Sequence, residues 1–230
     1  MEAHLGNYAE SRAHAQSCLR LCVESGSQWG LEMCYRTLGF GALGEGAFAE
    51  ASQWLHASID ICRGIHQRED LGLGLAYLAL ASRGLGRVPQ AWPYLEEALA
   101  IAVAAKVSAL QLVVVETAAL LLADQGEAES AVELHSLALR HPAVDNSKWF
   151  EDITAGHISK AAETLPPEAL DAAVARGRAR CLQKAVSELC ARFTVPTEYA
   201  ATRVTDVSQA SSTVLCVFPP ASPSPLAPAR

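Results

Sequence analysis

The sequence predicts an all-α protein, an α-solenoid of helix-turn-helix repeats with a period of 40 residues. The first indication is the spacing of Gly6, Gly46, Gly86 and Gly126, each of which opens a similar phrase. The second is composition, because alanine and leucine are abundant and both favour helices. The third is that apolar residues within each copy recur at the spacing of one helix face. A fixed period in this range is typical of stacked repeats.

The second helix of each repeat follows the glycine. Residues 18–22 align without gaps with 58–62 and 98–102. The fourth copy starts in register but ends at Pro142, since proline stops a helix. In the third copy a single apolar stripe consists of Val88, Ala91, Leu95, Ala98 and Leu99.

The first helix of each repeat precedes the glycine, and small residues such as Gly39, Ala79 and Ala119 let neighbouring helices approach closely. The stretch 107–123 is very apolar, but it includes Gln111 and falls short of a comfortable membrane span. We therefore expect a helix buried on two sides, and no membrane association. The aligned positions are Tyr35, Leu38, Gly39 and Ala42, then Leu75, Leu78, Ala79 and Ser82, then Val115, Ala118, Ala119 and Leu122.

The start of the chain leaves residues 1–5 for the first helix of the first repeat, which is too few. The helix at about 8–25 would then lack its partner and expose a seam of Ala15, Leu19 and Cys22. We expect that the chain is the C-terminal piece of a longer protein, or that its start is set too late. Self-association through this exposed helix is a further hypothesis.

We divide the chain into three parts. Residues 1–144 form the repeat array, with its first repeat truncated. Residues 145–193 are expected to be capping helices, one at 149–162 and a second that follows the turn at 164–168 and runs as far as Phe193. Residues 194–230 are rich in proline and serine and are expected to be disordered.

The second repeat carries a family resemblance. Its aromatic, Leu-Gly, small, glycine and alanine positions are Tyr35, Leu38, Gly39, Ala42, Gly46, Phe48, Ala51 and Leu55. This pattern resembles the tetratricopeptide repeat (TPR), in a long variant with about six extra residues. Departures are Arg63 and Val103 where the family has proline, and His135 where a large apolar residue is usual. The resemblance covers roughly residues 5–143.

A second resemblance lies after the array, in His141-Pro142-Ala143 and the later Leu-Pro-Pro-Glu and Arg-Gly-Arg-Ala phrases. These are similar to the ends of TPR arrays in large bacterial regulators, where the array follows an ATPase, kinase, cyclase or LuxR-type core. The resemblance implies a protein- or peptide-binding module that serves as a regulatory or scaffolding arm. The alternative is a small-molecule sensor that holds its ligand inside the superhelix.

The TPR resemblance also implies a binding groove on the first helices. An apolar floor with two arginines and one carboxylate suits a peptide with hydrophobic side chains and an acidic group. Packing against the next repeat or the capping helices explains the same pattern equally well. The groove positions are Met33, Arg36, Phe40, Leu43, Leu73, Ala76, Leu80, Arg83, Val113, Glu116, Leu120 and Ala123.

Other function classes have little support in the sequence. A net charge of −7 disfavours direct nucleic-acid binding, and the basic cluster at 176–184 is typical of a solvated helix face. No catalytic motif is present, so we expect no enzyme and no cofactor. The G-x-G-x-x-G at 39–44 lacks the preceding strand that a dinucleotide site needs. The absence of a signal peptide and the odd count of seven cysteines indicate a cytoplasmic protein with reduced thiols.

Three possible metal ligands, His14, Cys18 and Cys22, lie four residues apart on one helix face. Cys34 or Cys62 would have to supply a fourth. The later repeats carry serine, cysteine or alanine at the positions of Cys18 and Cys22, which favours packing over metal binding. We therefore expect no bound metal.

Overall fold

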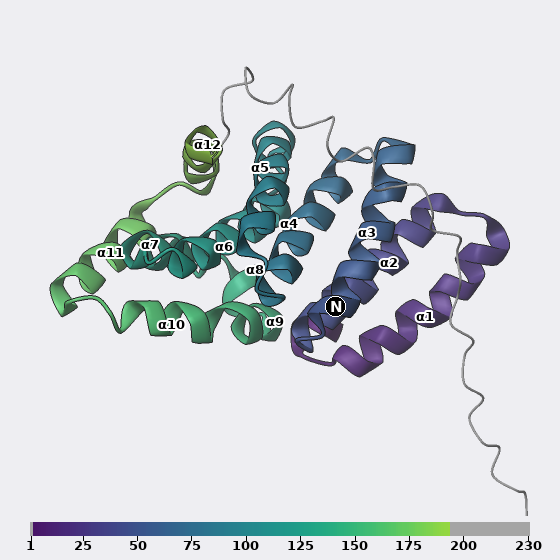
Figure 1. Ribbon diagram of the computed structural model, residues 1–230, viewed down its shortest axis with the longest axis horizontal. Helices are drawn as coiled ribbons and strands as arrows, with labels where there is room; N and C mark the ends of the chain where they lie inside the picture. The colour runs from purple at the N-terminus through teal and green to yellow at the C-terminus, as the bar shows by residue number, and fades with distance from the viewer. Residues whose placement is uncertain (1, 194–230) are drawn as a thin grey trace, which may run out of the picture. The chain divides into compact units, whose positions relative to one another are not determined.

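The computed structural model describes residues 2–193, and this part of the chain is all-α (Figure 1). The expected disordered tail at 194–230 lies outside the described residues. The array consists of a 3-10 turn η1 (Glu2–Leu5) and the helices α1 (Tyr8–Ser25), α2 (Gln28–Gly44), α3 (Phe48–Ile65), α4 (Arg68–Gly84), α5 (Val88–Ala105), α6 (Ser108–Asp124) and α7 (Ala128–Ala138). It is followed by α8 (Pro142–Asp145), α9 (Lys148–Phe150), the π-helical turn η2 (Glu151–Ala155), α10 (Gly156–Ala162), α11 (Pro167–Ala179) and α12 (Leu182–Phe193).

Successive helices pack as antiparallel pairs, and the pair repeats at about 40 residues. The pairs α2–α3, α4–α5 and α6–α7 correspond to the predicted repeats, so the all-α array of helix pairs is confirmed. The phrase-opening glycines lie in the turns inside these pairs. Gly46, Gly86 and Gly126 have φ of 70°, 74° and 83°, in the left-handed region that favours glycine. The turn conformation therefore explains the most regular feature of the sequence.

The small residues inside the helices allow close approach between them. A Cβ added at Gly39 would lie 2.6 Å from the Leu55 side chain, as the sequence predicted for this position. A Cβ added at Gly84 would lie 2.4 Å from the Phe48 ring. The whole G-x-G-x-x-G stretch is helical and lies inside α2, so it does not form the strand–turn–helix of a dinucleotide site.

The segment after the array differs from the prediction in two places. The expected helix at 149–162 is divided into α9, η2 and α10 by the π-helical turn. The expected helix that runs as far as Phe193 is interrupted, because Arg180 is extended with ψ of 152° and α12 begins anew at Leu182. The interruption lets α11 pack against α7 while α12 packs against α5, α6 and α7.

The expected exposed seam on the first helix is wrong for two of its three residues. Ala15 is 6% exposed and Cys22 is 9% exposed, because α1 packs on α2 through this face. The exposed apolar side chains of α1 are instead Leu21 and Val23, on its outer side. Within residues 2–193, no helix combines the length and the hydrophobicity that a membrane crossing demands.

Candidate functional site

The predicted groove residues lie on α2, α4 and α6, and most of them are buried. Twelve groove positions were predicted. Apart from Ala123, the one exposed side chain among them is Met33, at 38% exposed. Leu73, Arg36 and Arg83 are partly exposed. The buried members are Phe40, Leu43, Ala76, Leu80, Val113, Glu116 and Leu120. Packing, the alternative that the sequence left open, therefore accounts for most of the apolar floor.

Trp149 covers the middle of this surface. Its side chain is fully buried, and its ring stacks on Phe40 with centroids 4.1 Å apart and an interplanar angle of 12°. It meets Tyr77 edge-on at 5.6 Å, and its indole N–H donates to the Phe40 carbonyl oxygen at 2.8 Å. A residue of the C-terminal segment thus covers the predicted groove residue Phe40 and contacts Tyr77 on α4.

The rest of the C-terminal segment continues along the first helices. The turn η2 contacts α2, and α10 contacts α6 and α7. Beside Arg83, this packing leaves a cavity of only about 100 Å³, which Asp152, Ile153 and His157 help to line. The chain itself therefore covers the predicted groove around Leu80 and Arg83 on α4 and along α6.

Both predicted groove arginines have carboxylate partners within the protein. The Arg36 guanidinium donates to Glu32 at 2.8 Å and to Asp70 at 2.9 Å. Arg83 donates to both carboxylate oxygens of Asp124, at 2.7 and 2.8 Å. Burial lowers the pKa of Arg36, but the hydrogen bond that it donates to Glu32 and the charges of Glu32 and Asp70 outweigh burial and leave the pKa raised. An acidic ligand would have to displace these carboxylates, so the surface suits an apolar ligand better.

The predicted carboxylate, Glu116, also has an internal partner. It is 1% exposed, and both of its oxygens lie 3.0–3.1 Å from Nδ1 of His135. Burial lowers the pKa of His135, while the hydrogen bond and charge of Glu116 raise it by more, so the net shift is upward. The pair explains why histidine stands where the TPR pattern has a large apolar residue. A histidine at that position and a glutamate in an apolar helix were the two signals that could have predicted the pair.

One part of the predicted groove remains open, at the N-terminal end of α2. Trp29, Met33 and Thr37 follow one another at i, i+4 and i+8, which places them on one helix face. Trp29 is 53% exposed and Met33 is 38% exposed. Of these three residues, Thr37 lines a cavity of about 240 Å³, together with Ala3, His4, Ser11, Arg36, Phe40 and Tyr77. We call Trp29, Met33, Thr37 and this cavity the α2 face.

The α2 face belongs to the most apolar part of the described surface. Large exposed hydrophobic side chains within residues 2–193 are Leu5, Leu21, Val23, Trp29, Met33 and Leu139, and all but the last lie in η1, α1 and α2. Sequence reasoning missed Trp29, because the family pattern gives no groove position there. Its signal was the i, i+4 spacing to Met33.

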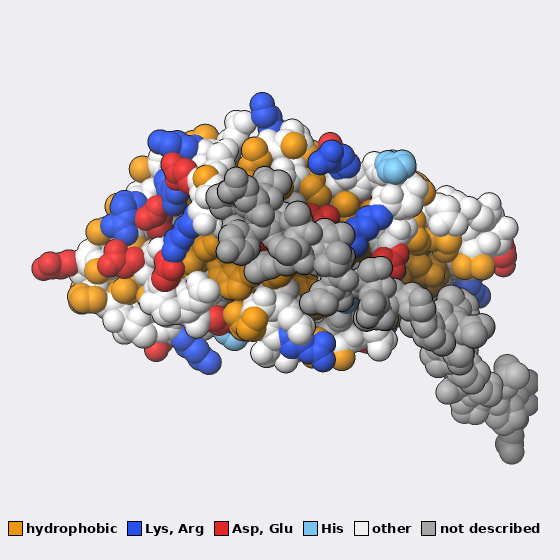
Figure 2. Space-filling model, turned by 45° about the horizontal axis from the view of Figure 1, so that its top comes forward, with side chains coloured by type: hydrophobic (Ala, Val, Ile, Leu, Met, Phe, Trp, Pro, Cys, Tyr) orange, Lys and Arg blue, Asp and Glu red, His pale blue; other side chains and the backbone are white. Residues whose placement is uncertain are grey.

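The opposite end of the array is polar. Arg176 pairs with Glu129 and Glu133, and Arg180 pairs with Glu133 and Glu188. Figure 2 shows basic and acidic side chains interleaved at this end, on the left of the view. Arg176 and Arg180 of the basic cluster therefore pair with carboxylates on α7 and α12, so basic and acidic groups alternate on this surface.

A group of cysteines is the remaining cluster of side chains that could bind a ligand or react. The thiols of Cys18, Cys22 and Cys34 lie together, whereas His14 and Cys62 are not part of the group.

Comparison of the chain with protein-family models, with curated proteins and with solved structures found no match. The functional reading therefore depends on the geometry of the described residues.

Proposed function

We propose that this chain is a protein- or peptide-binding helical-repeat module and not an enzyme. The observation that supports the proposal most is the α2 face, where Trp29 and Met33 are exposed on the helix face whose next turn, at Thr37, lines a cavity of about 240 Å³. Tryptophan and other large aromatic residues carry much of the binding energy at protein interfaces, and exposed apolar patches mark interaction sites. The partner is a protein or peptide that packs apolar side chains on Trp29 and Met33 and places one side chain in this cavity.

The chemistry of the lining defines the partner further. The cavity has aromatic walls from Phe40 and Tyr77 and polar edges from His4 and Thr37. Because Arg36 is already paired, the ligand needs no acidic group. Because the exposed lining is more polar than apolar, a helical or extended segment whose anchor carries a polar group on an apolar body suits it.

The biological role that we propose is a regulatory or scaffolding arm of a larger bacterial signalling or transcriptional regulator. The TPR-like period and the similarity of the phrases after the array to those regulators support it. The acidic net charge of −7 supports a protein partner over a nucleic acid. Self-association is a second form of the same proposal, in which α1 of one copy, through Leu21 and Val23, contacts another copy.

Display of random peptides on phage tests the proposal. Peptides selected on the folded chain are titrated against the wild type, the Trp29→Ala/Met33→Ala variant and a Leu139→Ala control, which removes an exposed apolar side chain elsewhere. We expect the double substitution to weaken binding at least tenfold, since an interface hot spot contributes about 2 kcal/mol or more. Equal affinity for all three proteins would refute binding at the α2 face.

A small-molecule sensor is the alternative that the sequence raised. Its ligand would lie inside the array, where Trp149 and α10 already pack. The cavity of the α2 face, about 240 Å³, is smaller than the roughly 300–1,000 Å³ typical of ligand pockets. A single side chain of a peptide suits this volume better than a whole metabolite does.

A further inference from the structure

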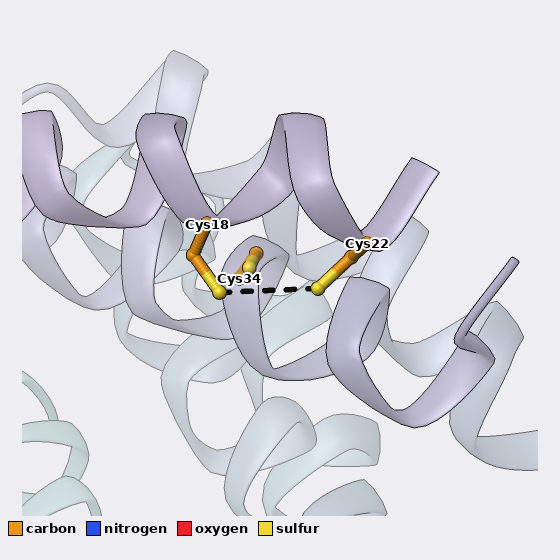
Figure 3. A group of neighbouring side chains, drawn as sticks. All are labelled: Cys18, Cys22 and Cys34. Atoms are coloured by element: carbon orange, nitrogen blue, oxygen red, sulfur yellow. Dashed lines mark hydrogen bonds between the residues drawn. The ribbon is translucent and has the colours of Figure 1, made fainter. Parts of the chain in front are cut away.

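Three cysteine thiols converge at the interface between α1 and α2 (Figure 3). Cys18 and Cys22 are four residues apart on α1, and Cys34 comes from α2. The Sγ atoms of Cys18 and Cys22 are 3.8 Å apart, and all three sulfur atoms lie within 4.8 Å of one another. Figure 3 shows all three side chains directed into one space between the helices.

The local fold creates this space. The turn after α1 returns the chain so that α2 packs on the face that carries Cys22. Gly30 lies opposite, and a Cβ there would come within 2.5 Å of the Cys22 sulfur. A residue without a side chain on α2 therefore makes room for the thiol group.

The other repeats show that helix packing does not require three thiols here. Forty residues after Cys18, Cys22 and Cys34 the chain has Ser58, Cys62 and Gly74, and forty further on it has Ala98, Ala102 and Val114. The same helix interfaces form in those repeats without a cysteine triad. In the sequence, the later repeats favoured packing at the positions of Cys18 and Cys22. Cys34, which completes the cluster, was not included in that alignment.

We propose that Cys18, Cys22 and Cys34 bind one thiophilic d¹⁰ metal ion, Zn²⁺ or Cu⁺, through three sulfur ligands. Tetrahedral zinc with Zn–S bonds of about 2.3 Å requires sulfur atoms about 3.8 Å apart. One pair has this separation already, and rotation of the side chains by less than about 1 Å at sulfur would complete the site. Three S–H bonds are exchanged for three S–metal bonds, and the protons pass to solvent.

The solvent exposure of the three cysteines determines how the coordination of the metal ion would be completed. Cys34 is buried at 4% exposed, whereas Cys18 is exposed, so one side of the metal would be open to solvent. Within residues 2–193 the group contains no fourth histidine, cysteine or carboxylate ligand. Cu⁺ is satisfied by three thiolates, and Zn²⁺ would add a water molecule or a group from a partner. In either case the ion would link α1 to α2. One of its ligands, Cys34, directly follows Met33 of the α2 face in the sequence.

Metal titration of the reduced full chain tests the proposal. The protein used carries Cys62→Ser, Cys181→Ser, Cys190→Ser and Cys216→Ser, which leaves the three thiols of the cluster as its cysteines. Zn²⁺ and Cu⁺ are each titrated in competition with a chromophoric chelator, and each ion is judged by whether it saturates at one equivalent. We expect one equivalent to bind, with a loss of more than about 100-fold in affinity on adding Cys34→Ser. Restoring Cys181, an exposed cysteine outside the cluster, should leave the affinity of this site unchanged.

Two outcomes would overturn the proposal: neither ion saturates at one equivalent, or Cys34→Ser binds equally well with its helix content intact. Absorption by bound Co²⁺ provides a second measurement. It uses the three-thiol protein itself, so the result does not depend on whether a further variant folds. Thiolate-to-cobalt charge-transfer bands with the intensity of three sulfur ligands would support the site. Their absence would exclude Zn²⁺ as the ion, and failure of Cu⁺ to saturate at one equivalent as well would exclude the site. Neither result depends on the peptide-binding proposal.

Discussion

Trp149→Ala should be the most destabilising single substitution in the C-terminal segment. The indole is fully buried, stacks on Phe40, meets Tyr77 edge-on and donates its N–H to a backbone carbonyl 109 residues away in the chain. Removal of a buried tryptophan side chain costs about 3–5 kcal/mol through lost burial and a cavity. The lost hydrogen bond from the indole N–H to the Phe40 carbonyl adds about 1 kcal/mol.

The total of about 4–6 kcal/mol approaches the whole stability of many domains, about 5–15 kcal/mol. Trp149→Phe keeps an aromatic ring but loses the donor, so its cost should be smaller, about 1–3 kcal/mol. Trp29→Ala is the matched control, because Trp29 is 53% exposed, and its cost should be within about 0.5 kcal/mol.

The assay is urea unfolding at equilibrium, followed by circular dichroism at a helix wavelength. The expected order of destabilisation is Trp149→Ala, then Trp149→Phe, then Trp29→Ala. If Trp149→Ala unfolds within about 0.5 kcal/mol of the wild type, the reasoning is wrong, because the C-terminal segment would then not be packed into the first helices.

Two further predictions concern stability. Gly84→Ala should lower the free energy of unfolding by about 1–3 kcal/mol, since its Cβ would meet the Phe48 ring. Gly41→Ala, which has open space around it, should raise the free energy of unfolding by about 0.5–1 kcal/mol in the same urea assay. The opposite order would contradict the helix contacts. His135→Gln should lose stability mainly at low pH. The folded pKa of His135 is raised above 6.5, so its pairing with Glu116 contributes fully below the unfolded value and is lost as the pH rises through the folded value. Unfolding curves at pH 5.5 and pH 8.5 measure the difference, and an equal loss at both would refute the charged pair.

The sequence predicted the array well because its signals are local. The glycines that mark the period are required by turns with positive φ, and Gly39 is small because Leu55 packs against it. Such constraints act between neighbouring helices and repeat along the chain. They therefore leave a periodic pattern that can be recognised without the structure.

The filling of the groove could not be predicted in this way. The hydrogen bond from Trp149 to Phe40 joins residues 109 positions apart, and Trp149 has no counterpart in the repeats. An apolar groove floor and an apolar core have the same composition, so the pattern alone could not decide between them. The break at Arg180 was missed for a similar reason, because the packing of α12 on α5 and α6 determines it.

The cysteine cluster shows a third limit. The spacing of Cys18 and Cys22 on one helix face was visible in the sequence, and Cys34 was only one of two candidates for a further ligand. The packing of α1 on α2 selects Cys34 and leaves out His14 and Cys62. Periodicity places residues on a face, but the contact between two faces decides which residues meet.

The most direct test of the central claim, that the α2 face binds a peptide, is methyl NMR of the chain labelled at methionine. The sequence has two methionines, Met1 and Met33, so one of the two resonances reports on the middle of this face. Addition of a display-selected peptide should shift or broaden the Met33 methyl signal in step with binding. A peptide that binds tightly and leaves the Met33 signal unchanged would contradict the proposed site.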